Sequence, residues 1–397
     1  MLFCRSLLLF FVLLSALAAP VFSQTTHTIS GHIRDVQSGE TLIGASIRLS
    51  TDVSVGARAN NYGFYSLTLH EGRHTLVVSH VGYQSQELAI ELAADTVVDI
   101  ELRSGELLQE VVVSKSAADD QVRSPQMGLT RVDVNEIKHV PVLMGEKDVL
   151  KTIQLLPGVL SGGEGSSNFF VRGGAGDQNL ILLDEATVYN ASHLFGFFST
   201  FNSDAIKDVK LYKGGMPAQY GGRLSSVLDI TMQDGNKKSF GAEGGIGLIA
   251  SRLKVEGPIV KNRGSFVVSG RRTYADMFLK LSDDEAVKNS RLYFYDLNAK
   301  ANYRLDERNT LYLSGYFGRD VMGYSGLFGF DWGNSTGTLR WNRVWNNRWF
   351  SNTTAVYSNF NYNVNIESDD FNFVIASRIQ NYNLKQDFQF FATNKST

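Results

Sequence analysis

This 397-residue chain has a single cysteine, Cys4, which lies close to the N-terminus. It falls inside residues 1–23, where an early positive charge, the apolar run Leu7–Ala19 and a few small residues follow one another. This order predicts a secretory signal peptide, cleaved after Ser23 or, alternatively, after Ala18. A membrane-anchoring helix is the competing interpretation, but the run is shorter than the roughly 20 residues that a spanning helix needs. The mature chain would then have no cysteine, which excludes disulfides, cysteine nucleophiles and cysteine-based metal sites.

Proline, net charge and long apolar runs are also scarce. The chain has 6 Pro, and its 38 Lys and Arg nearly balance its 40 Asp and Glu, so no strongly basic field suggests a nucleic-acid partner. The 37 Gly and the aromatic content of 11% favour β-structure over disorder. Beyond the signal peptide no run of about 18 unbroken apolar residues occurs, so any insertion into a membrane must use strands.

The residue patterns of common enzymes and metal sites are missing as well. The seven histidines are scattered without a His-Glu-x-x-His motif, and His70, His74 and His80 lie across a turn and a strand. No Gly-x-Ser-x-Gly motif frames a serine as a nucleophile. We therefore predict that the protein is not an enzyme and has no catalytic residues, no metal site and no cofactor.

Residues 26–103 predict a small all-β domain. Short runs such as HTISGHIRD, YGFYSLTL and RHTLVVSHVGY are rich in β-forming residues, and turn sequences such as NNYG and HEGR separate them. About seven short strands in fewer than about 80 residues are typical of a β-sandwich.

Residues 107–116 form a short segment that strongly favours an extended conformation. The β-branched run Val111–Val113 is flanked by charged residues and followed by a polar linker. This composition is expected of a peptide that adds itself as a strand to the sheet edge of another protein. The alternative is that it forms the last strand of the preceding sandwich, and the residues alone favour neither.

Residues 125–234 predict a mixed α/β unit. In GEKDVLKTIQLLPGV, the side chains of Val149, Ile153 and Leu156 share one helical face, and Pro157-Gly158 is expected to end the helix. Further along, Asn202 or Ser203 is expected to cap a short helix that leads into a strand.

The stretch FFVRGGAGDQNLILLD joins two extended runs of this unit through a glycine-rich turn. It lacks the Lys-Ser/Thr pair and the following helix of a phosphate-binding loop. An exported protein also has no reliable access to nucleotide. We therefore predict a tight structural turn between two strands.

Residues 240–397 have a different composition and hold 28 of the 45 aromatic residues, including all four Trp. The clearest strand is YFYDLNAKANYRL, in which the odd-numbered residues Tyr293 to Leu305 take one face and the even-numbered residues Phe294 to Arg304 take the other. Clean alternation over this length exceeds the usual strand of about five or six residues. Long strands with one apolar, aromatic-flanked face and one polar face are typical of a transmembrane β-barrel. A soluble sheet is the alternative.

The order of these segments resembles the TonB-dependent outer-membrane receptors, in particular those with an N-terminal carboxypeptidase regulatory-like domain. The first domain carries the resemblance in SGHIRDVQSGETLIGASIRL and NNYGFYSLTLHEGRHTLVVSHVGY. The α/β unit resembles their plug in LKTIQLLPGV, FFVRGGAGDQNLILLD and DAIKDVKLYKGGMPAQYGGRLSSVLDITMQ, and EGPIVKNRGSFVVSGRRTY resembles the first barrel hairpin. The resemblance implies a mainly β fold: a transthyretin-like β-sandwich at 26–103, an α/β plug at 125–234 and the first strands of an antiparallel transmembrane β-barrel at 240–397.

The resemblance also implies site residues, beginning with a TonB box at residues 107–116. The residues that would contact TonB are Gln109, Glu110, Val111, Val112, Val113 and Ser114. The structural positions of the plug would be Pro157, Gly158, Arg172, Gly173, Gly174, Asp184, Gly214, Tyr220, Gly221 and Arg223. Arg172 and Asp184 are expected to pair with each other or with polar groups of the inner barrel wall, because buried charges need partners. LDEATVYNASHLFG departs from the Asp-Gly turn of many plugs in a region that faces substrate in the family, so no ligand-binding residues are carried over.

A function follows from the same resemblance. It implies an outer-membrane receptor that actively imports a scarce ligand, such as a siderophore, a glycan or a peptide, with TonB and its inner-membrane energising complex as partners. The sandwich and the TonB box would lie in the periplasm, the strands would contact outer-membrane lipid, and a surface lipoprotein is a further candidate partner. The alternative is a surface adhesin or binding protein that works through the sandwich without transport. A signalling transducer is a third hypothesis.

The length of the last region leads to one more expectation. A plugged transporter barrel has about 22 strands, each of about 10 residues, which is more than the 158 residues from 240 to 397 can supply. Seven or eight strands can be counted there. We therefore expect an incomplete curved sheet, and a chain that is a fragment or a truncated gene product of a longer receptor.

Overall fold

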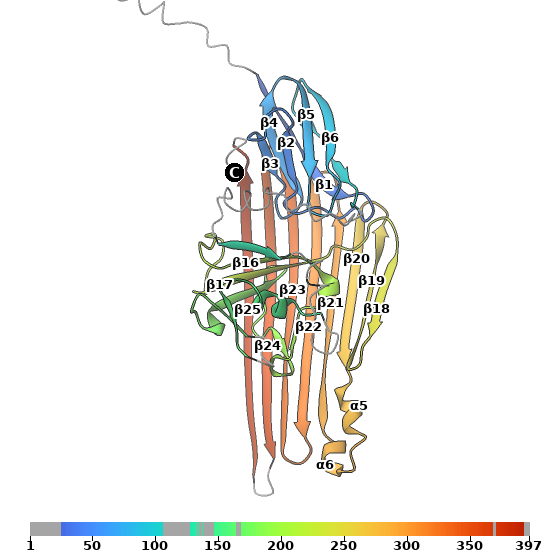
Figure 1. Ribbon diagram of the computed structural model, residues 1–397, viewed down its shortest axis with the longest axis vertical. Coiled ribbons are helices and arrows are strands. Elements are labelled where there is room, and N and C mark those ends of the chain that lie inside the picture. Colours follow the sequence, from blue (N-terminus) through green and yellow to red (C-terminus); the bar gives the residue numbers. More distant parts are fainter. Residues whose placement is uncertain are drawn as a thin grey trace, which may run out of the picture.

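The computed structural model describes residues 25–105, 128–132, 134, 137, 147–163, 168–367 and 371–392 (Figure 1). This part of the chain is mainly β-structure and forms three parts in sequence order. We call them the sandwich (residues 26–102), the central unit (129–232) and the long sheet (241–390). The predicted signal peptide and the segment 107–116 lie outside the described residues. Among the described residues, no helix has both the length and the apolar character to cross a membrane.

The sandwich consists of two four-stranded sheets, which confirms the predicted fold. In one sheet β1 pairs antiparallel with β4 and parallel with β7 and β8, and the other sheet has the order β3-β2-β5-β6. Apolar side chains from both sheets, including Ile29, Ile33, Ile47 and Leu76, are buried together in one core. The strands are β1 (Thr26–Asp35), β2 (Ser46–Leu49), β3 (Gly56–Arg58), β4 (Phe64–His70), β5 (Gly72–Ser79), β6 (Gln86–Leu92), β7 (Thr96–Val97) and β8 (Ile100–Leu102).

The central unit is built on a five-stranded sheet of order β13-β12-β17-β16-β9, in which only β12 and β17 run parallel. Two short antiparallel ribbons, β10–β11 and β14–β15, accompany it. Its strands are β9 (Leu129–Val132), β10 (Val159–Ser161), β11 (Phe169–Val171), β12 (Asn179–Leu183), β13 (Ala186–Thr187), β14 (Ser192–His193), β15 (Phe198–Ser199), β16 (Ile206–Tyr212) and β17 (Ser226–Met232). The helical turns are α4 (Val149–Gln154) and the 3₁₀ turns η2 (Gly176–Gln178), η3 (Leu194–Gly196) and η4 (Ser203–Ala205).

The helix α4 forms where the sequence predicts it but ends earlier. Val149 and Ile153 are buried in the core of the central unit, as the helical spacing requires. The helix ends at Gln154, before the expected stop at Pro157-Gly158. Leu156 therefore lies outside the helix, although it still packs against the same core. The predicted cap at Asn202 is confirmed, because its side chain accepts a hydrogen bond from the backbone N–H of Asp204 (3.1 Å) at the start of η4.

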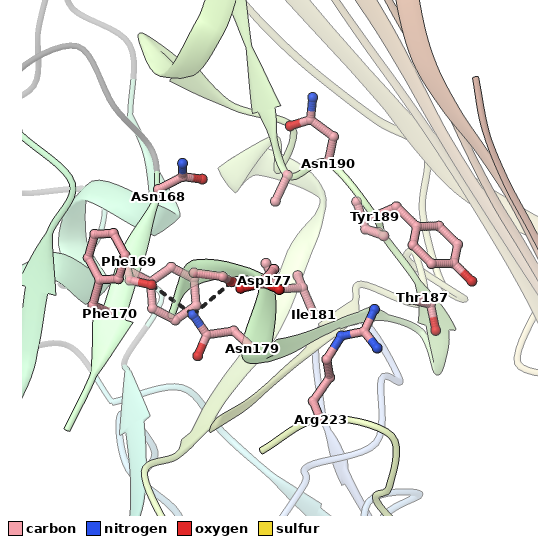
Figure 2. Close-up of a pocket in the computed structure, with 13 residues that line it drawn as sticks. Asn168, Phe169, Phe170, Asp177, Asn179, Ile181, Thr187, Tyr189, Asn190 and Arg223 are labelled. Atoms are coloured by element: carbon pink, nitrogen blue, oxygen red, sulfur yellow. Dashed lines mark hydrogen bonds between the residues drawn. The ribbon is translucent and has the colours of Figure 1, made fainter. Parts of the chain in front are cut away.

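The glycine-rich turn joins two strands, as predicted, and these strands belong to different sheets. β11 pairs with β10, whereas β12 pairs with β13 and β17. A single 3₁₀ turn, η2, lies between them where no helix was expected. The Asn179 side chain holds this connection closed by donating to the carbonyls of Phe169 (2.7 Å) and Gly176 (3.2 Å) (Figure 2).

The long sheet contains eight antiparallel strands within the described residues, in sequence order from β18 to β25, and resembles part of a barrel. This confirms the prediction of seven or eight long strands. The strands are β18 (Gly241–Ile246), β19 (Ala250–Val260), β20 (Gly264–Thr273), β21 (Arg291–Arg304), β22 (Asn309–Tyr324), β23 (Phe328–Asn346), β24 (Trp349–Glu367) and β25 (Asn372–Phe390). Two short helices, α5 (Ala275–Leu279) and α6 (Glu285–Lys288), connect β20 to β21.

The two faces of the long sheet differ sharply in character. The register aligns one row of apolar residues across six strands, namely Phe266, Ala301, Leu313, Leu339, Ala355 and Leu384. The next row on the other face is polar and consists of Ser265, Asn302, Tyr312, Arg340, Thr354 and Lys385. Leu313 is 60% exposed and Leu384 is 77% exposed, whereas Asn302 and Arg340 are buried. The predicted alternation of β21 is therefore confirmed, and we call the apolar side the outer face and the polar side the inner face.

The three parts meet along the inner face and one end of the long sheet. In Figure 1 the central unit, in green, lies across the middle of the orange and red strands, and the sandwich, in blue, lies at their upper end. The Asp184 side chain pairs with Lys300 of the inner face, and the backbone carbonyl of Asn190 accepts from the Asn334 side chain (2.6 Å). Polar residues of the inner face, such as Lys300 and Asn334, therefore have partners in the central unit.

Candidate functional site

One contact between the central unit and the inner face is a buried ion network around Lys300 of β21. Its Nζ lies 3.2 Å from Asp184 Oδ2 and 2.9 Å from Asp234 Oδ1, and it donates to the carbonyl of Met232 (2.8 Å). The three charged side chains are at most 6% exposed. This network fixes the end of the central unit to the wall, and it confirms the prediction that Asp184 pairs with a polar group of the inner face.

Asp184 owes its position to a sharp turn after β12. Asp184 and Glu185 have φ angles of 46° and 72°, in the left-handed region that few non-glycine residues adopt. The turn is held because the Asp184 side chain accepts from the backbone N–H of Met232 (2.9 Å). Glu185 continues the contact, with Arg340 Nη2 at 2.9 Å from its Oε1. Two consecutive carboxylates of the central unit thus point at cations of the inner face.

Asp234 links this network to a second lysine, Lys207 of β16, at 3.2 Å. Burial by itself raises the pKa of the Asp234 carboxyl, but Lys207 and Lys300 outweigh burial and hold that pKa well below its usual value. Lys207 also pairs with Glu40 of the sandwich (3.0 Å). A continuous chain of charges therefore runs from the long sheet through the central unit to the sandwich.

A second buried cluster surrounds His193, at the end of β14. Its Nδ1 lies 2.7 Å from Asp320 Oδ2 of β22, its Nε2 lies 3.3 Å from Asp296 Oδ2 of β21, and its ring stacks on Phe294 at 4.0 Å. Arg271 of β20 neutralises the second aspartate at 2.7 Å. Burial lowers the pKa of His193, but the two aspartates outweigh it and the pKa is raised above 6.5. The two aspartates therefore favour the charged form of His193, and its contacts with them anchor the loop to the wall.

This histidine cluster was not predicted from the sequence. His193 lies in LDEATVYNASHLFG, the stretch that departs from the family pattern. Asp296 was assigned to the polar face of its strand. The single acids Asp296 and Asp320 were the only sequence features that could have indicated a buried charged partner. Their histidine partner is more than 100 residues away in sequence, and only the docking of the central unit brings the three residues together.

Four of the predicted plug positions gather at one corner of the central unit. The backbone N–H of Arg172 donates to the carbonyl of Gly158 (3.2 Å), and Lys213 Nζ donates to the carbonyl of Pro157 (2.9 Å). A Cβ at Gly214 would lie 2.8 Å from the Arg172 guanidinium, so the glycine leaves room for that side chain. Within the described residues Arg172 has no ion pair, and the alternative of an Arg172–Asp184 pair is therefore wrong.

The remaining plug positions lie on the two sides of the glycine-rich turn. Gly173 has a φ of 83°, and a Cβ on Gly174 would overlap the Ser225 side chain. The loop between β16 and β17 carries Tyr220, Gly221 and Arg223. Tyr220 donates to Asp229 Oδ2 (2.9 Å), Gly221 has open space around it, and Arg223 donates to the carbonyl of Gly222 (2.8 Å). Arg223 also lines a cavity.

A cavity of about 380 Å³ opens beside the glycine-rich turn. In Figure 2 Arg223 extends toward Thr187 and Tyr189, and Phe169 and Phe170 line the other side. A few hydrogen-bonding groups among aromatic side chains are typical of ligand sites. This cavity is the candidate ligand-facing site of the central unit, and its right-hand wall in Figure 2 comes from the stretch that departs from the family pattern.

In comparisons with known proteins, two segments of the chain match protein families. Residues 29–113 match the family described as the carboxypeptidase D regulatory-like domain, and residues 122–226 match the family described as the TonB-dependent receptor plug domain. A stretch of 77 residues, 19% of the chain, is 34% identical to bacillopeptidase F from Bacillus subtilis (strain 168) and covers 5% of that protein.

Two receptors are among the solved structures that align with this chain. A mutant ferric enterobactin receptor from Pseudomonas aeruginosa is 15% identical over 68% of this chain and 46% of its own, with a TM-score of 0.48. The siderophore receptor PirA from Acinetobacter baumannii is 15% identical over 65% of this chain and 45% of its own, also with a TM-score of 0.48. The chain spans about half the length of these structures.

Proposed function

Because the chain contains a carboxypeptidase regulatory-like domain followed by a TonB-dependent receptor plug domain, we propose that it is an outer-membrane receptor for TonB-dependent import of a scarce ligand. One observation carries this proposal. The residues that match the plug family form a unit that docks on the polar inner face of a long β-sheet. The central unit is the plug, the long sheet is barrel wall, and the sandwich lies on the periplasmic side.

The two faces of the long sheet support a place in the membrane. Its outer face exposes a continuous apolar row, and aromatic residues such as Trp341, Trp345 and Trp349 lie near the end where the sandwich docks. Transmembrane barrels have an outward apolar band flanked by aromatic girdles and a polar interior. The charged residues of the inner face have partners in the plug, as a water-poor lumen requires.

TonB would act on the segment 107–116. Its β-branched run favours an extended strand, and strand addition uses backbone hydrogen bonds that any such segment can offer. The core of the described sandwich is formed by residues up to Leu102. Pulling on the segment would transmit force to the plug and displace it, with the inner-membrane proton gradient as the source of energy.

Binding of TonB to the full chain tests this proposal. We expect the purified periplasmic domain of the organism's own TonB to bind the chain in detergent, and deletion of residues 107–116 to abolish that binding. Val112→Pro should weaken binding at least tenfold, about 1.4 kcal/mol, because proline removes a backbone donor and fits poorly within a paired strand. Ala118→Pro, outside the segment, is the matched control and should bind like the unchanged chain. Isothermal titration calorimetry measures all four.

Persistence of TonB binding after the deletion would show that the proposed contact is wrong. A second outcome bears on the alternative role of the segment. If Val112→Pro lowers the unfolding temperature of the sandwich by several degrees while Ala118→Pro does not, residues 111–113 belong to the sandwich as its last strand. Far-UV circular dichroism of the same samples provides that comparison.

A further inference from the structure

The sandwich docks tightly on the end of the long sheet. Phe350 at the start of β24 is 1% exposed and stacks between Tyr62 and Phe64 of the sandwich, at ring distances of 5.3 and 5.6 Å. Arg348 Nε donates to the hydroxyl of Thr28 (2.9 Å). This interface joins the first domain to the turns at one end of the wall.

A cavity of about 200 Å³ lies at the edge of this interface. Three parts of the chain contribute to it: the sandwich, the segment that follows β17, and the turns after β19 and β21. Five cationic side chains and one carboxylate line it. They are Arg34, Lys237, Lys238, Arg263, Arg304 and Glu101.

Two of these cations are neutralised by carboxylates. Arg34 Nη1 lies 2.6 Å from Asp99 Oδ2, and Lys238 Nζ lies 3.1 Å from Glu101 Oε1. Asp306 and Glu307 are also near, but they line the neighbouring cavity. Their carboxylates form no ion pair with the cations of this cavity among the described residues.

The other three cations have no carboxylate partner among the described residues. Arg263 Nη2 donates to the carbonyls of Arg304 (3.3 Å) and Leu305 (2.9 Å), and Arg304 Nη2 donates to the carbonyl of Asn262 (3.4 Å). A carbonyl oxygen satisfies a donor but does not cancel its charge. The ammonium of Lys237 has no hydrogen bond or ion pair within the described part of the chain. Positive charge is therefore in excess here.

The environment of Lys237 reflects this excess. Burial is the main cause that lowers the pKa of Lys237 to about 8, and Arg34 and Lys207 lower it further against the opposing effect of Asp234 and Glu40. An anion placed in the cavity would offset both the burial and the repulsion.

We propose that this cavity binds a phosphate-bearing anion between Lys237, Arg263 and Arg304. Guanidinium groups match the oxygens of a phosphate with paired, charge-assisted hydrogen bonds, and an ammonium group adds a point charge. Thr41 and Thr310 line the same cavity and add hydroxyl donors. The anion bridges sandwich, plug segment and wall, so its binding stabilises the docked sandwich. A free phosphate and a phospholipid headgroup at the membrane rim both supply this chemistry.

Titration of the full chain in a phosphate-free, uncharged detergent tests the proposal. The probes are inorganic phosphate and a short-chain phosphatidylglycerol, and binding is measured by isothermal titration calorimetry. We expect saturable binding of at least one probe, weakened at least tenfold by Lys237→Gln. Arg263→Gln should weaken it similarly, and because Arg263 is exposed this variant should fold. Lys261→Gln changes an exposed lysine outside the cavity and is the matched control, with unchanged binding.

The pattern across the two probes identifies the source of the anion. Binding of the lipid at least tenfold more tightly than inorganic phosphate assigns a headgroup, and comparable binding of both assigns the phosphate group alone. The proposal is overturned if neither probe binds the unchanged chain. It is equally overturned if Lys237→Gln and Arg263→Gln, both folded by circular dichroism, bind the probes as tightly as Lys261→Gln.

Discussion

Replacing Lys300 by methionine is expected to lower the free energy of unfolding by about 3–5 kcal/mol, the usual cost of removing one partner from a buried ion network. Methionine keeps the length and apolar stem of lysine, so packing changes little. The loss arises because Asp184 and Asp234 would remain buried without the cation that both of them face. Denaturant titration of the full chain in detergent micelles measures it.

The matched control is Lys288→Met. Lys288 is 48% exposed and pairs with Glu285 one turn away, at 3.3 Å, on the short helix α6. Such a pair contributes less than about 0.5 kcal/mol, so this variant should unfold like the unchanged chain. Adding Asp184→Asn to Lys300→Met should restore part of the loss, because it removes the carboxylate charge that loses its lysine partner, whereas Asp234 keeps Lys207. A fall below about 1 kcal/mol for Lys300→Met would contradict the proposed anchoring of the plug.

The same network predicts an acid limit. The pKa of Asp234 is lowered in the folded chain, so its stabilising contribution is fully present above the ordinary carboxyl pKa near 3.8 and is lost as the pH falls below that value. In Lys300→Met one of its two lysine partners is gone. The unfolding free energy of this variant should therefore depend less on pH below about pH 4 than that of the unchanged chain.

Replacing His193 by glutamine is expected to remove a pH dependence of the unfolding free energy above about pH 6.5. The folded pKa of His193 is raised above 6.5, so its contribution is complete below that pH and is lost as the pH rises through the higher folded pKa. The groups that face it are Asp296, Asp320, Arg271 and Tyr316. At about pH 6 the variant should be less stable by about 1.5–3 kcal/mol, the range for hydrogen bonds to charged groups.

The difference in unfolding free energy between the two proteins should shrink as the pH rises through the raised pKa of His193, because the imidazole then loses its charge in the unchanged chain. His70→Gln replaces an exposed histidine of the sandwich and is the control, which should keep the pH dependence of the unchanged chain. Denaturant midpoints in micelles between about pH 6 and 9 give the comparison. A slope that is the same for His193→Gln and the unchanged chain would show that the histidine does not anchor the loop.

Much of the fold follows from patterns that the sequence displays directly. The period-two alternation from Tyr293 to Leu305 fixes which side chains face inward, because a strand has no other way to bury one set and expose the other. Asn202 was recognised as a cap because its side chain competes for the first free N–H groups of a helical turn. These are local features, and local sequence determines them.

The parts that were wrong or missed depend on contacts between distant segments. The strands beside the glycine-rich turn are neighbours in sequence, but β12 pairs with β17, whose residues follow more than 40 positions later. The helix α4 ends before Leu156, and Leu156 packs against the core from outside the helix. His193 meets its aspartates only because the plug docks on the wall, and Arg34 meets the cations around Lys237 only because the sandwich docks on the rim.

The central claim is that the outer face of the long sheet contacts lipid while the inner face contacts the plug. Leu313 and Ser314 are neighbours on β22, 60% and 7% exposed respectively. With Cys4→Ser as a cysteine-free background, a spin label at Leu313→Cys in the full chain, reconstituted in lipid vesicles, should be accessible to oxygen dissolved in the bilayer and shielded from a water-soluble nickel complex. A label at Ser314→Cys should be shielded from both. Free collision of the nickel complex with the label at position 313 would contradict the account.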